Sequence, residues 1–190
     1  MEEKKKLLLK LKKYSFDNHI PIVKDDTLFF LQKIIFDKKI INIMEIGTAI
    51  GYSALGMSNY NNHIQTIERD YEKYKLALYF FKNSNYKIDF IWSEAFCYQP
   101  KQKYDLIFID AAKVQYQKLF EKYSLFLNSK GLIICDNINL NKLKNKKNLK
   151  RIIRIMEKMN DFKLFLKKNI LFKTIFYNIG DGISISQKYI

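Results

Sequence analysis

The chain has 190 residues, about the length of one domain, and its 48% hydrophobic and 15% aromatic content excludes a disordered protein. Its 34 lysine and arginine residues outnumber the 19 acidic residues, which gives a formal net charge of +15. Such a charge favours a polyanionic partner, with nucleic acid the first candidate. An AT-rich coding sequence would also produce an excess of lysine, so the charge leaves both explanations open.

Cysteine and histidine are too scarce for most zinc sites. Cys97 and Cys135 stand far apart without CxxC spacing, and only His19 and His63 accompany them. We therefore expect any metal to be a hard ion held by oxygen atoms. The first residues lack the apolar core of a signal peptide, and no apolar run approaches the length of a membrane span. We expect a cytoplasmic protein without a membrane partner.

In chain order, the first predicted elements are two helices, at 1–20 and 25–37. The first is basic and amphipathic, and the pattern ends at Pro21. The second would be capped by Asp25 or Asp26. The apolar face of the first helix consists of Leu7, Leu8 and Leu11.

Five apolar runs then predict strands, and stretches of helical length separate them. The strands are expected at 40–47, 63–70, 87–92, 104–110 and 131–136, and helices at 70–83 and 113–127. Apolar strands that alternate with helices predict a doubly wound α/β sheet, parallel and covered on both faces. Two β-rich runs around Asp181-Gly182, within 173–189, predict a closing antiparallel hairpin. No linker or repeat divides the chain, which predicts a single domain over 1–190.

An acid or an amide follows every predicted strand. In a doubly wound sheet, ligands bind beyond the carboxyl ends of the strands, so these side chains would gather at one edge. Solvated loops alone would not produce such regularity. The residues concerned are Glu45, Glu68, Glu94, Asp110, Asp136 and Asn137.

The loop after the first strand carries Gly47 and Gly51, which let the backbone approach a ligand closely. The dinucleotide fingerprint GxGxxG is absent. Glu68 follows Gly47 by 21 residues, at the place where an acid can hold ribose hydroxyls, although it can equally cap a helix. Together these residues indicate an adenosine-containing ligand.

Asp110, Asp136 and Asn137 form the more specific group. If their strands are neighbours, the strand ends lie about 4.8 Å apart, and two carboxylates with one amide oxygen suit Mg²⁺ or another hard divalent ion. Lys113 would stand on the first turn of the next helix, where a nearby cation disfavours the ammonium form and permits general-base catalysis. The alternatives are two turn acids that cap separate helices, and an ordinary surface lysine.

The stretch 141–158 is the most basic part of the chain and also carries an apolar stripe. It is either an ordinary surface helix or a rim that binds RNA phosphates. The candidate RNA-binding residues are Lys142, Lys144, Lys146, Lys147, Lys150, Arg151 and Arg154.

Residues 20–190 resemble the cation-dependent class I O-methyltransferases, the family of the catechol and caffeoyl-CoA O-methyltransferases. EIGTAIGYS resembles that family's first S-adenosylmethionine motif, and TIERD, DLIFIDAAK, GLIICDNI and GDGISIS match its later motifs in order and spacing. The short chain, PIV at 21–23 and EIGTAIGYS most resemble the bacterial tRNA 5-hydroxyuridine methyltransferases. The resemblance implies a Rossmann-like fold with a seven-stranded, mostly parallel sheet, S-adenosylmethionine and Mg²⁺ as cofactors, and a homodimer.

The resemblance also implies residue roles. Asp110, Asp136 and Asn137 would hold the metal, and Lys113 would be the catalytic base with Asp110 beside it. The family more often has Asp in place of Glu94. The cofactor would be bound by Val23, Glu45, Gly47, Ser53, Glu68, Glu94, Ala95 and Asp110.

The implied reaction is methylation of the 5-hydroxyl of the wobble uridine in the tRNA anticodon loop, which gives 5-methoxyuridine. Lys113 would take the proton of a hydroxyl whose pKa is lowered by bound Mg²⁺, and the oxyanion would attack the sulfonium methyl in line. Two alternatives stay open. One is a catechol-type O-methyltransferase of small molecules, and the other is a non-catalytic RNA-binding module on a methyltransferase fold.

Overall fold

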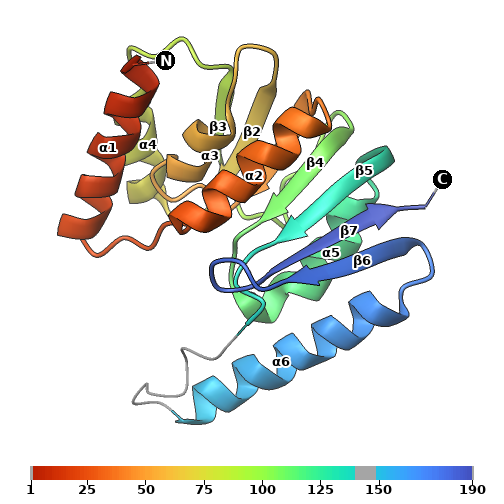
Figure 1. Ribbon diagram of the computed structural model, residues 1–190. Coiled ribbons are helices and arrows are strands. Elements are labelled where there is room, and N and C mark those ends of the chain that lie inside the picture. Colours follow the sequence, from red (N-terminus) through yellow and green to blue (C-terminus); the bar gives the residue numbers. More distant parts are fainter. Residues whose placement is uncertain (1, 140–148, 190) are drawn as a thin grey trace. The chain divides into compact units, whose positions relative to one another are not determined.

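The computed structural model describes residues 2–139 and 149–189 (Figure 1). The chain divides into two compact units, Met1–Gln99 and Pro100–Ile190. In the first unit, three parallel strands stand in the order β3-β2-β1. Its elements are α1 (Glu2–Asp17), α2 (Asp25–Asp37), β1 (Asn42–Ile46), α3 (Tyr52–Met57), β2 (His63–Glu68), α4 (Tyr71–Phe81) and β3 (Ile88–Trp92).

Helix α1 is held in the first unit by one buried apolar residue and one lysine. Leu11 is fully buried, and Lys4 Nζ donates a hydrogen bond to the carbonyl of Gly56 at the end of α3. Burial lowers the pKa of Lys4 to about 8. Because Leu11 packs inside the unit, this residue of the predicted apolar face contributes to the core and is not exposed to solvent.

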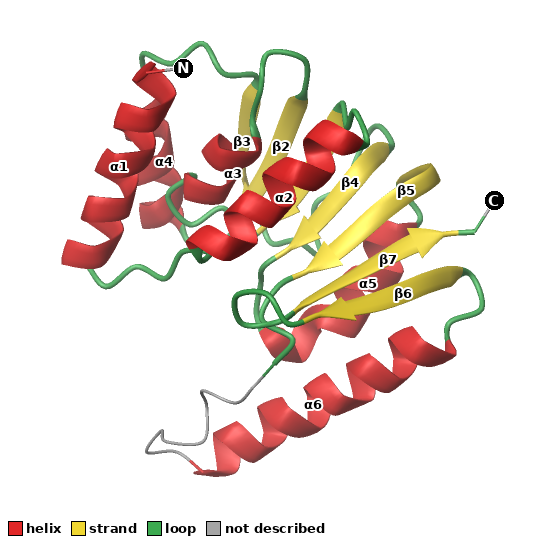
Figure 2. Ribbon diagram, in the orientation of Figure 1, coloured by secondary structure: helices red, strands yellow, loops and turns green. Residues whose placement is uncertain are grey.

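The second unit contains four strands in the order β4-β5-β7-β6. Strands β4 and β5 are parallel, whereas β7 runs antiparallel to both β5 and β6, so that the arrows of β6 and β7 point in opposite directions (Figure 2). Its elements are β4 (Tyr104–Ile109), the 3₁₀ turn η1 (Lys113–Gln115), α5 (Tyr116–Ser124), β5 (Leu127–Cys135), α6 (Leu149–Lys168), β6 (Phe172–Tyr177) and β7 (Ile183–Lys188).

All seven strands belong to one mixed sheet with the order β3-β2-β1-β4-β5-β7-β6. Strands β1, β2 and β3 are parallel to one another, as are β4 and β5, and the two C-terminal strands form the antiparallel part. The prediction of a Rossmann-like α/β sheet that ends in an antiparallel hairpin is therefore confirmed.

Several predicted boundaries were wrong. Lys24, not Asp25 or Asp26, is the N-cap of α2, and both acids lie in its first turn, where they complement the helix dipole. The helix predicted at 113–127 is divided into η1 and α5 and stops at Ser124. It stops because Leu127 already pairs with Tyr104 as the first residue of β5.

The prediction that a helical stretch separates every pair of strands is wrong between β3 and β4, where the chain contains turns and no helix.

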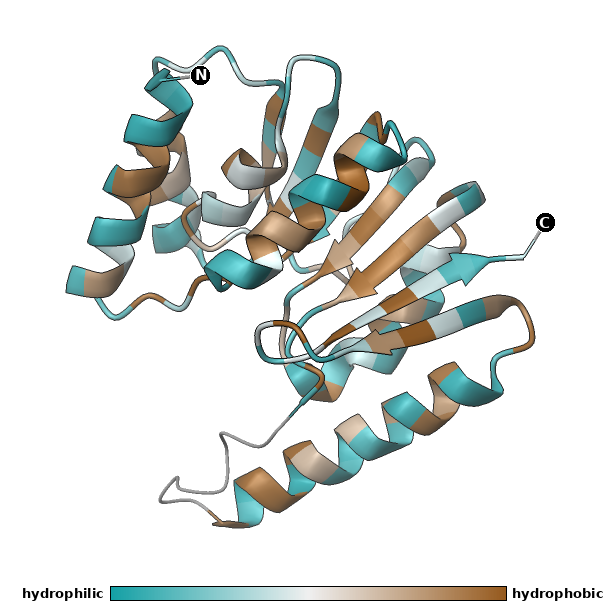
Figure 3. Cartoon of the chain, viewed as in Figure 1, coloured by the Kyte–Doolittle hydropathy of each residue, from teal (hydrophilic) through white to brown (hydrophobic). Residues whose placement is uncertain are grey.

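Helix α6 is clearly amphipathic, with hydrophobic and hydrophilic residues alternating along it (Figure 3). Ile152, Met159, Phe162 and Leu166 are its buried residues. Within the described part of the chain, every helix is too short or too polar to cross a membrane.

Candidate active site

The parallel pairing of β4 and β5 brings two acids to the same sheet edge. Ile109 is in register with Cys135, and the residues that follow them are Asp110 and Asp136. The backbone N–H of Asp136 donates to the carbonyl of Ile109 across 3.1 Å, which carries the pairing one residue beyond the strands. The predicted neighbourhood of these strand ends is confirmed.

Asn137 connects the two carboxylates. Its amide Nδ2 lies 3.2 Å from Asp110 Oδ1 and 3.0 Å from Asp136 Oδ2, and donates to both. Its backbone adopts φ +57°, a left-handed conformation that asparagine tolerates better than most residues. The turn after β5 thus directs this side chain toward both acids, and the three predicted metal ligands meet.

Burial makes both carboxylates hard to ionise, and like charge adds to the effect at Asp136. Burial raises the pKa of Asp110 to about 6, although Lys113 and the Asn137 amide oppose the shift. Burial also raises the pKa of Asp136 to about 7, with further contributions from the negative charges of Asp110 and Asp181. A cation between these groups would favour their charged forms.

Lys113 is the first residue of η1, three residues before α5 begins at Tyr116. Its positive charge lowers the pKa of both Asp110 and Asp136, so it lies near the pair. The prediction placed it on the first turn of a long helix, and the structure instead gives it a short 3₁₀ turn. Its role as a base stays a prediction.

The donor set fits a hard divalent ion. Asp136 Oδ1 is buried and has no hydrogen-bond partner among the described residues, and a bound cation would satisfy it. Two carboxylates and one amide oxygen are ligands that Mg²⁺ accepts, with waters completing its shell. Within 2–139 and 149–189, no group of three or more His, Cys, Asp or Glu side chains could hold a metal. Any ion here therefore depends on the amide as well.

In the first unit, a buried polar chain runs from β1 to the following loop. Glu45 is fully buried within β1, and Thr66 of β2 donates to its Oε2. Because the Thr66 hydroxyl has a single proton, Thr48 must donate to Thr66 across their 2.6 Å separation. This arrangement fixes the start of the loop that carries Gly47.

Glu68 closes that loop from the opposite side. Its Oε2 accepts the backbone N–H of Ala49 at 2.8 Å, and its Oε1 accepts that of Asp70 at 2.9 Å. Gly47 and Gly51 have positive φ values of 108° and 87°, as the close backbone turn requires. Each carboxylate oxygen keeps a second lone pair, which is the capacity that ribose hydroxyls would need.

The other predicted cofactor residues are spread over the first unit. Val23 and Ser53 are buried, Ala95 is half-buried, and Glu94 is exposed with an Oε1 that lies 3.9 Å from Arg69 Nη1. Asp110 belongs to the second unit. The binding roles of all these residues stay predictions.

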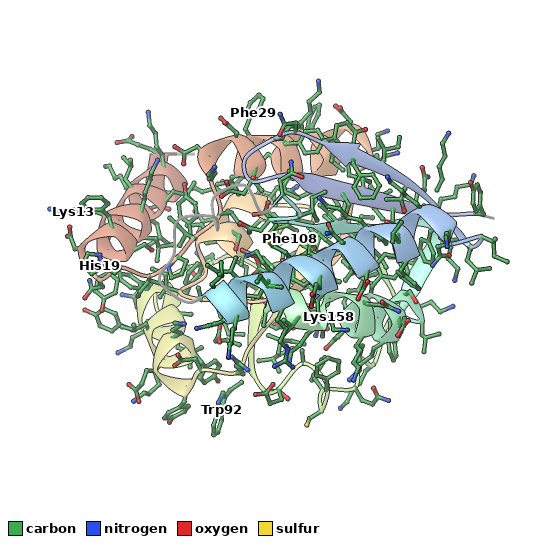
Figure 4. The ribbon with its side chains drawn as sticks, turned by 90° about the horizontal axis from the view of Figure 1, so that it is seen from below. Lys13, His19, Phe29, Trp92, Phe108 and Lys158 are labelled. Carbon is green, nitrogen blue, oxygen red and sulfur yellow. The ribbon has the colours of Figure 1, made fainter. Side chains whose placement is uncertain are left out.

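Trp92 marks the end of β3. Its Nε1 donates to the carbonyl of Arg69 at 3.2 Å, and its ring centroid lies 4.6 Å from that of Tyr71. The side chain is 57% exposed, in contrast to the buried Phe108 of β4 (Figure 4).

Sequence reasoning missed two contributors. Thr66 holds Glu45, and Tyr116 Oη donates to the backbone carbonyl of Asp136 at 2.9 Å. Tyr116 lies in the helix predicted at 113–127, and the sequence pattern gives no sign of its hydroxyl contact. Thr66 lies in the strand predicted at 63–70, but its partner depends on the β1–β2 register.

The candidate RNA-binding residues fall into two groups. Lys150, Arg151 and Arg154 are exposed on α6. Lys142, Lys144, Lys146 and Lys147 lie outside the described residues.

A family model described as O-methyltransferase matches residues 2–189. The chain belongs to the O-methyltransferase family. This confirms the family resemblance of the sequence, whereas the special closeness to tRNA-modifying members stays a prediction.

Individual relatives agree with the family. This O-methyltransferase is 29% identical to "Tapetum-specific methyltransferase 1" of Arabidopsis thaliana, over 95% of its own length and 83% of the relative's. A crystal structure of a candidate caffeoyl-CoA O-methyltransferase from Staphylococcus aureus is 31% identical, with a TM-score of 0.85 and coverage of 99% and 100% of the two chains. The SAH-bound methyltransferase PaMTH1 of Podospora anserina, 20% identical, shares the fold with a TM-score of 0.80 over 97% and 88%.

Proposed function

We propose that this O-methyltransferase transfers the methyl group of S-adenosylmethionine to the 5-hydroxyl of 5-hydroxyuridine at the wobble position of tRNA, with Mg²⁺ as a second cofactor. The observation that carries the proposal is the meeting of Asp110, Asp136 and Asn137 beside a buried carboxylate oxygen without a described partner. A hydroxylated base whose hydroxyl adjoins a carbonyl offers two oxygens to such a site.

The cofactor assignment rests on the family and on the first unit. The structure of PaMTH1, which shares this fold, holds SAH. Glu68, at the end of β2 and tied to the Gly47–Gly51 loop, has the position and the free lone pairs for the ribose hydroxyls. Ser53 and Val23, both buried, would contact the methionine part.

Mg²⁺, when bound, supplies Lewis-acid polarisation that lowers the pKa of the acceptor hydroxyl. Asp110 and Asp136 would hold it with their carboxylates, and Asn137 would add its amide oxygen after a flip of the amide, whose nitrogen faces both acids in this structure. Lys113 in its neutral form takes the hydroxyl proton. The oxygen's electron pair then forms the new C–O bond while the C–S bond breaks, so that S-adenosylhomocysteine leaves.

Support for an RNA substrate comes from charge. The chain carries a formal charge of +15, and Lys150, Arg151 and Arg154 are exposed on α6, the helix that follows the Asp136–Asn137 turn. Cations on one face attract the phosphate backbone, and a wobble base in a loop can unstack into a pocket. The small pair Ala111-Ala112 next to Asp110 leaves room for a base.

The decisive experiment supplies tRNA that contains 5-hydroxyuridine, together with S-adenosylmethionine and Mg²⁺, and analyses the nucleosides by mass spectrometry. We expect 5-methoxyuridine with the wild-type protein and none with Asp136→Ala. Absence of 5-methoxyuridine from the wild-type reaction would refute the tRNA assignment. Unchanged methylation by Asp136→Ala would refute the cation site.

A small-molecule acceptor is the second candidate, because the Staphylococcus aureus relative is described as a candidate caffeoyl-CoA enzyme. The same assay with catechol or caffeoyl-CoA in place of tRNA distinguishes the two, since only one acceptor should be methylated. A non-catalytic RNA-binding module would bind tRNA and methylate neither acceptor.

A further inference from the structure

The hydroxyl of Tyr116 lies between the two strand ends that carry the carboxylates. It donates to the backbone carbonyl of Asp136 at 2.9 Å. The same oxygen receives a hydrogen bond from the backbone of Ala111, the residue after Asp110. One phenol therefore contacts the main chain beside both acids, although Tyr116 itself lies on α5.

The ring that carries this hydroxyl is fixed. Tyr116 is fully buried, and its ring packs edge-on against Phe162 of α6 at 5.7 Å between centroids. Phe120, one turn further along α5, packs edge-on against the same Phe162 at 6.2 Å. A buried aromatic ring in such packing cannot swing away, so the hydroxyl stays where the two strand ends need it.

The backbone that it holds needs support. After β5 ends at Cys135, residues 136–139 have no regular structure, and Asn137 adopts φ +57°. The N–H groups of Ile138 and Asn139 are held by the carbonyls of Gly182 and Asp181. The carbonyl of Asp136 has the Tyr116 hydroxyl as its partner, at the point where the chain changes direction.

We propose that Tyr116 is a positioning residue that presets the Asp110–Asp136–Asn137 cluster for a divalent cation. Hydrogen bonds behind metal ligands set ligand orientation, and their loss costs about tenfold or more in metal affinity. This inference rests on the cation site of the proposed function and adds a residue that touches neither cation nor acceptor.

The test measures Mn²⁺ binding to the full-length protein, by electron paramagnetic resonance of free Mn²⁺, without substrate or turnover. Tyr116→Phe removes only the hydroxyl and should raise the dissociation constant about tenfold. Tyr123→Phe is the matched control, because it removes a second fully buried hydroxyl from the same helix. Its dissociation constant should stay within about twofold of wild type, since Tyr123 lies about two turns further along α5 than Tyr116.

A rescue variant separates positioning from general loosening. Tyr116→p-aminophenylalanine keeps a donor on the same ring and should bind Mn²⁺ more tightly than Tyr116→p-methylphenylalanine, which fills the same space without a donor. This pair also replaces Tyr116→Phe if that variant does not fold, as judged by circular dichroism.

The outcomes are distinct. Weaker binding by Tyr116→Phe together with rescue by the amino variant supports the inference. Wild-type affinity in Tyr116→Phe, or equal affinities of the amino and methyl variants, overturns it and leaves the proposed cation site standing. Failure of the wild-type protein itself to bind Mn²⁺ overturns both.

Discussion

Asp136 carries an unusual combination of properties for a single residue. It is 2% exposed, one of its oxygens has no described partner, and it faces the carboxylate of Asp110. A buried charge without compensation is costly, so the side chain is protonated more readily than a surface acid. These properties do not stabilise the fold, but they are expected of a residue that binds a cation.

The raised pKa values of Asp110 and Asp136 make the metal-free protein less stable as the pH rises. Because the folded state keeps these protons up to about pH 6 and 7 while the unfolded chain releases them near 3.8, stability falls across this interval. Thermal unfolding in EDTA should show a smaller fall between pH 5 and pH 8 for Asp136→Asn than for wild type. Equal falls would contradict the assignment of these carboxylates.

Lys113 is the proposed catalytic base. Replacement by Gln should lower kcat by about 10²–10⁴-fold, the usual contribution of a positioned base. The dissociation constant of S-adenosylmethionine, measured by calorimetry, should not change, because Lys113 is not among the predicted cofactor-binding residues. Lys118→Gln, an exposed lysine on α5, is the control and should keep full activity. A Lys113→Gln enzyme with normal kcat would exclude it as the base.

The backbone of the loop between β1 and α3 restricts which side chains it accepts. Gly51 has φ +87°, and a Cβ there would lie 2.7 Å from the ring of Phe81. Ala49, in the same loop, also has a positive φ, of 48°. The loop therefore tolerates a side chain at one position and excludes it at the other.

Gly51→Ala should destabilise the protein by about 1–3 kcal/mol, from strain and from the clash with Phe81. Ala49→Gly is the matched change in the opposite direction and should be neutral or stabilising by up to about 1 kcal/mol, because it relieves a left-handed alanine. Urea unfolding measures both. Similar effects of the two substitutions would show that backbone conformation does not control this loop.

The elements themselves were largely predictable, because apolar runs mark buried strands and the acids after them mark strand ends. The meeting of Asp110 with Asp136 followed from that pattern once β4 and β5 were neighbours. The contacts of Tyr116 were not predictable, because they depend on α5 packing against α6. The left-handed turn at Asn137 leaves no mark in the hydrophobic pattern of the sequence. The short η1 and the absence of a helix between β3 and β4 likewise reflect tertiary contacts that override local propensity.

The positive charge of the whole molecule allows an RNA-modifying enzyme to be distinguished from a small-molecule enzyme by experiment. Lysine and arginine exceed acids by 34 to 19, and many of these side chains are exposed. Binding that depends on phosphate contacts weakens steeply with salt, whereas binding of a neutral aromatic acceptor does not.

The affinity for tRNA should fall with salt, with a slope of log K against log salt of about −0.7 per phosphate contact. Lys150→Ala/Arg151→Ala/Arg154→Ala should make this slope shallower by about two, if each side chain meets one phosphate. The control changes three exposed lysines elsewhere, Lys101, Lys103 and Lys118, to alanine. Filter binding at several salt concentrations measures the slopes, and equal slopes for the two triple variants would refute a specific role for α6.

The single tryptophan of the chain, Trp92, lies at the carboxyl end of β3, bonded to Arg69 and packed on Tyr71. Glu68, the predicted ribose ligand, directly precedes Arg69. All indole fluorescence of this enzyme therefore comes from Trp92, a partly exposed side chain near Glu68. The unmodified protein already carries an optical reporter for nucleoside titrations, and Trp92→Phe provides its blank.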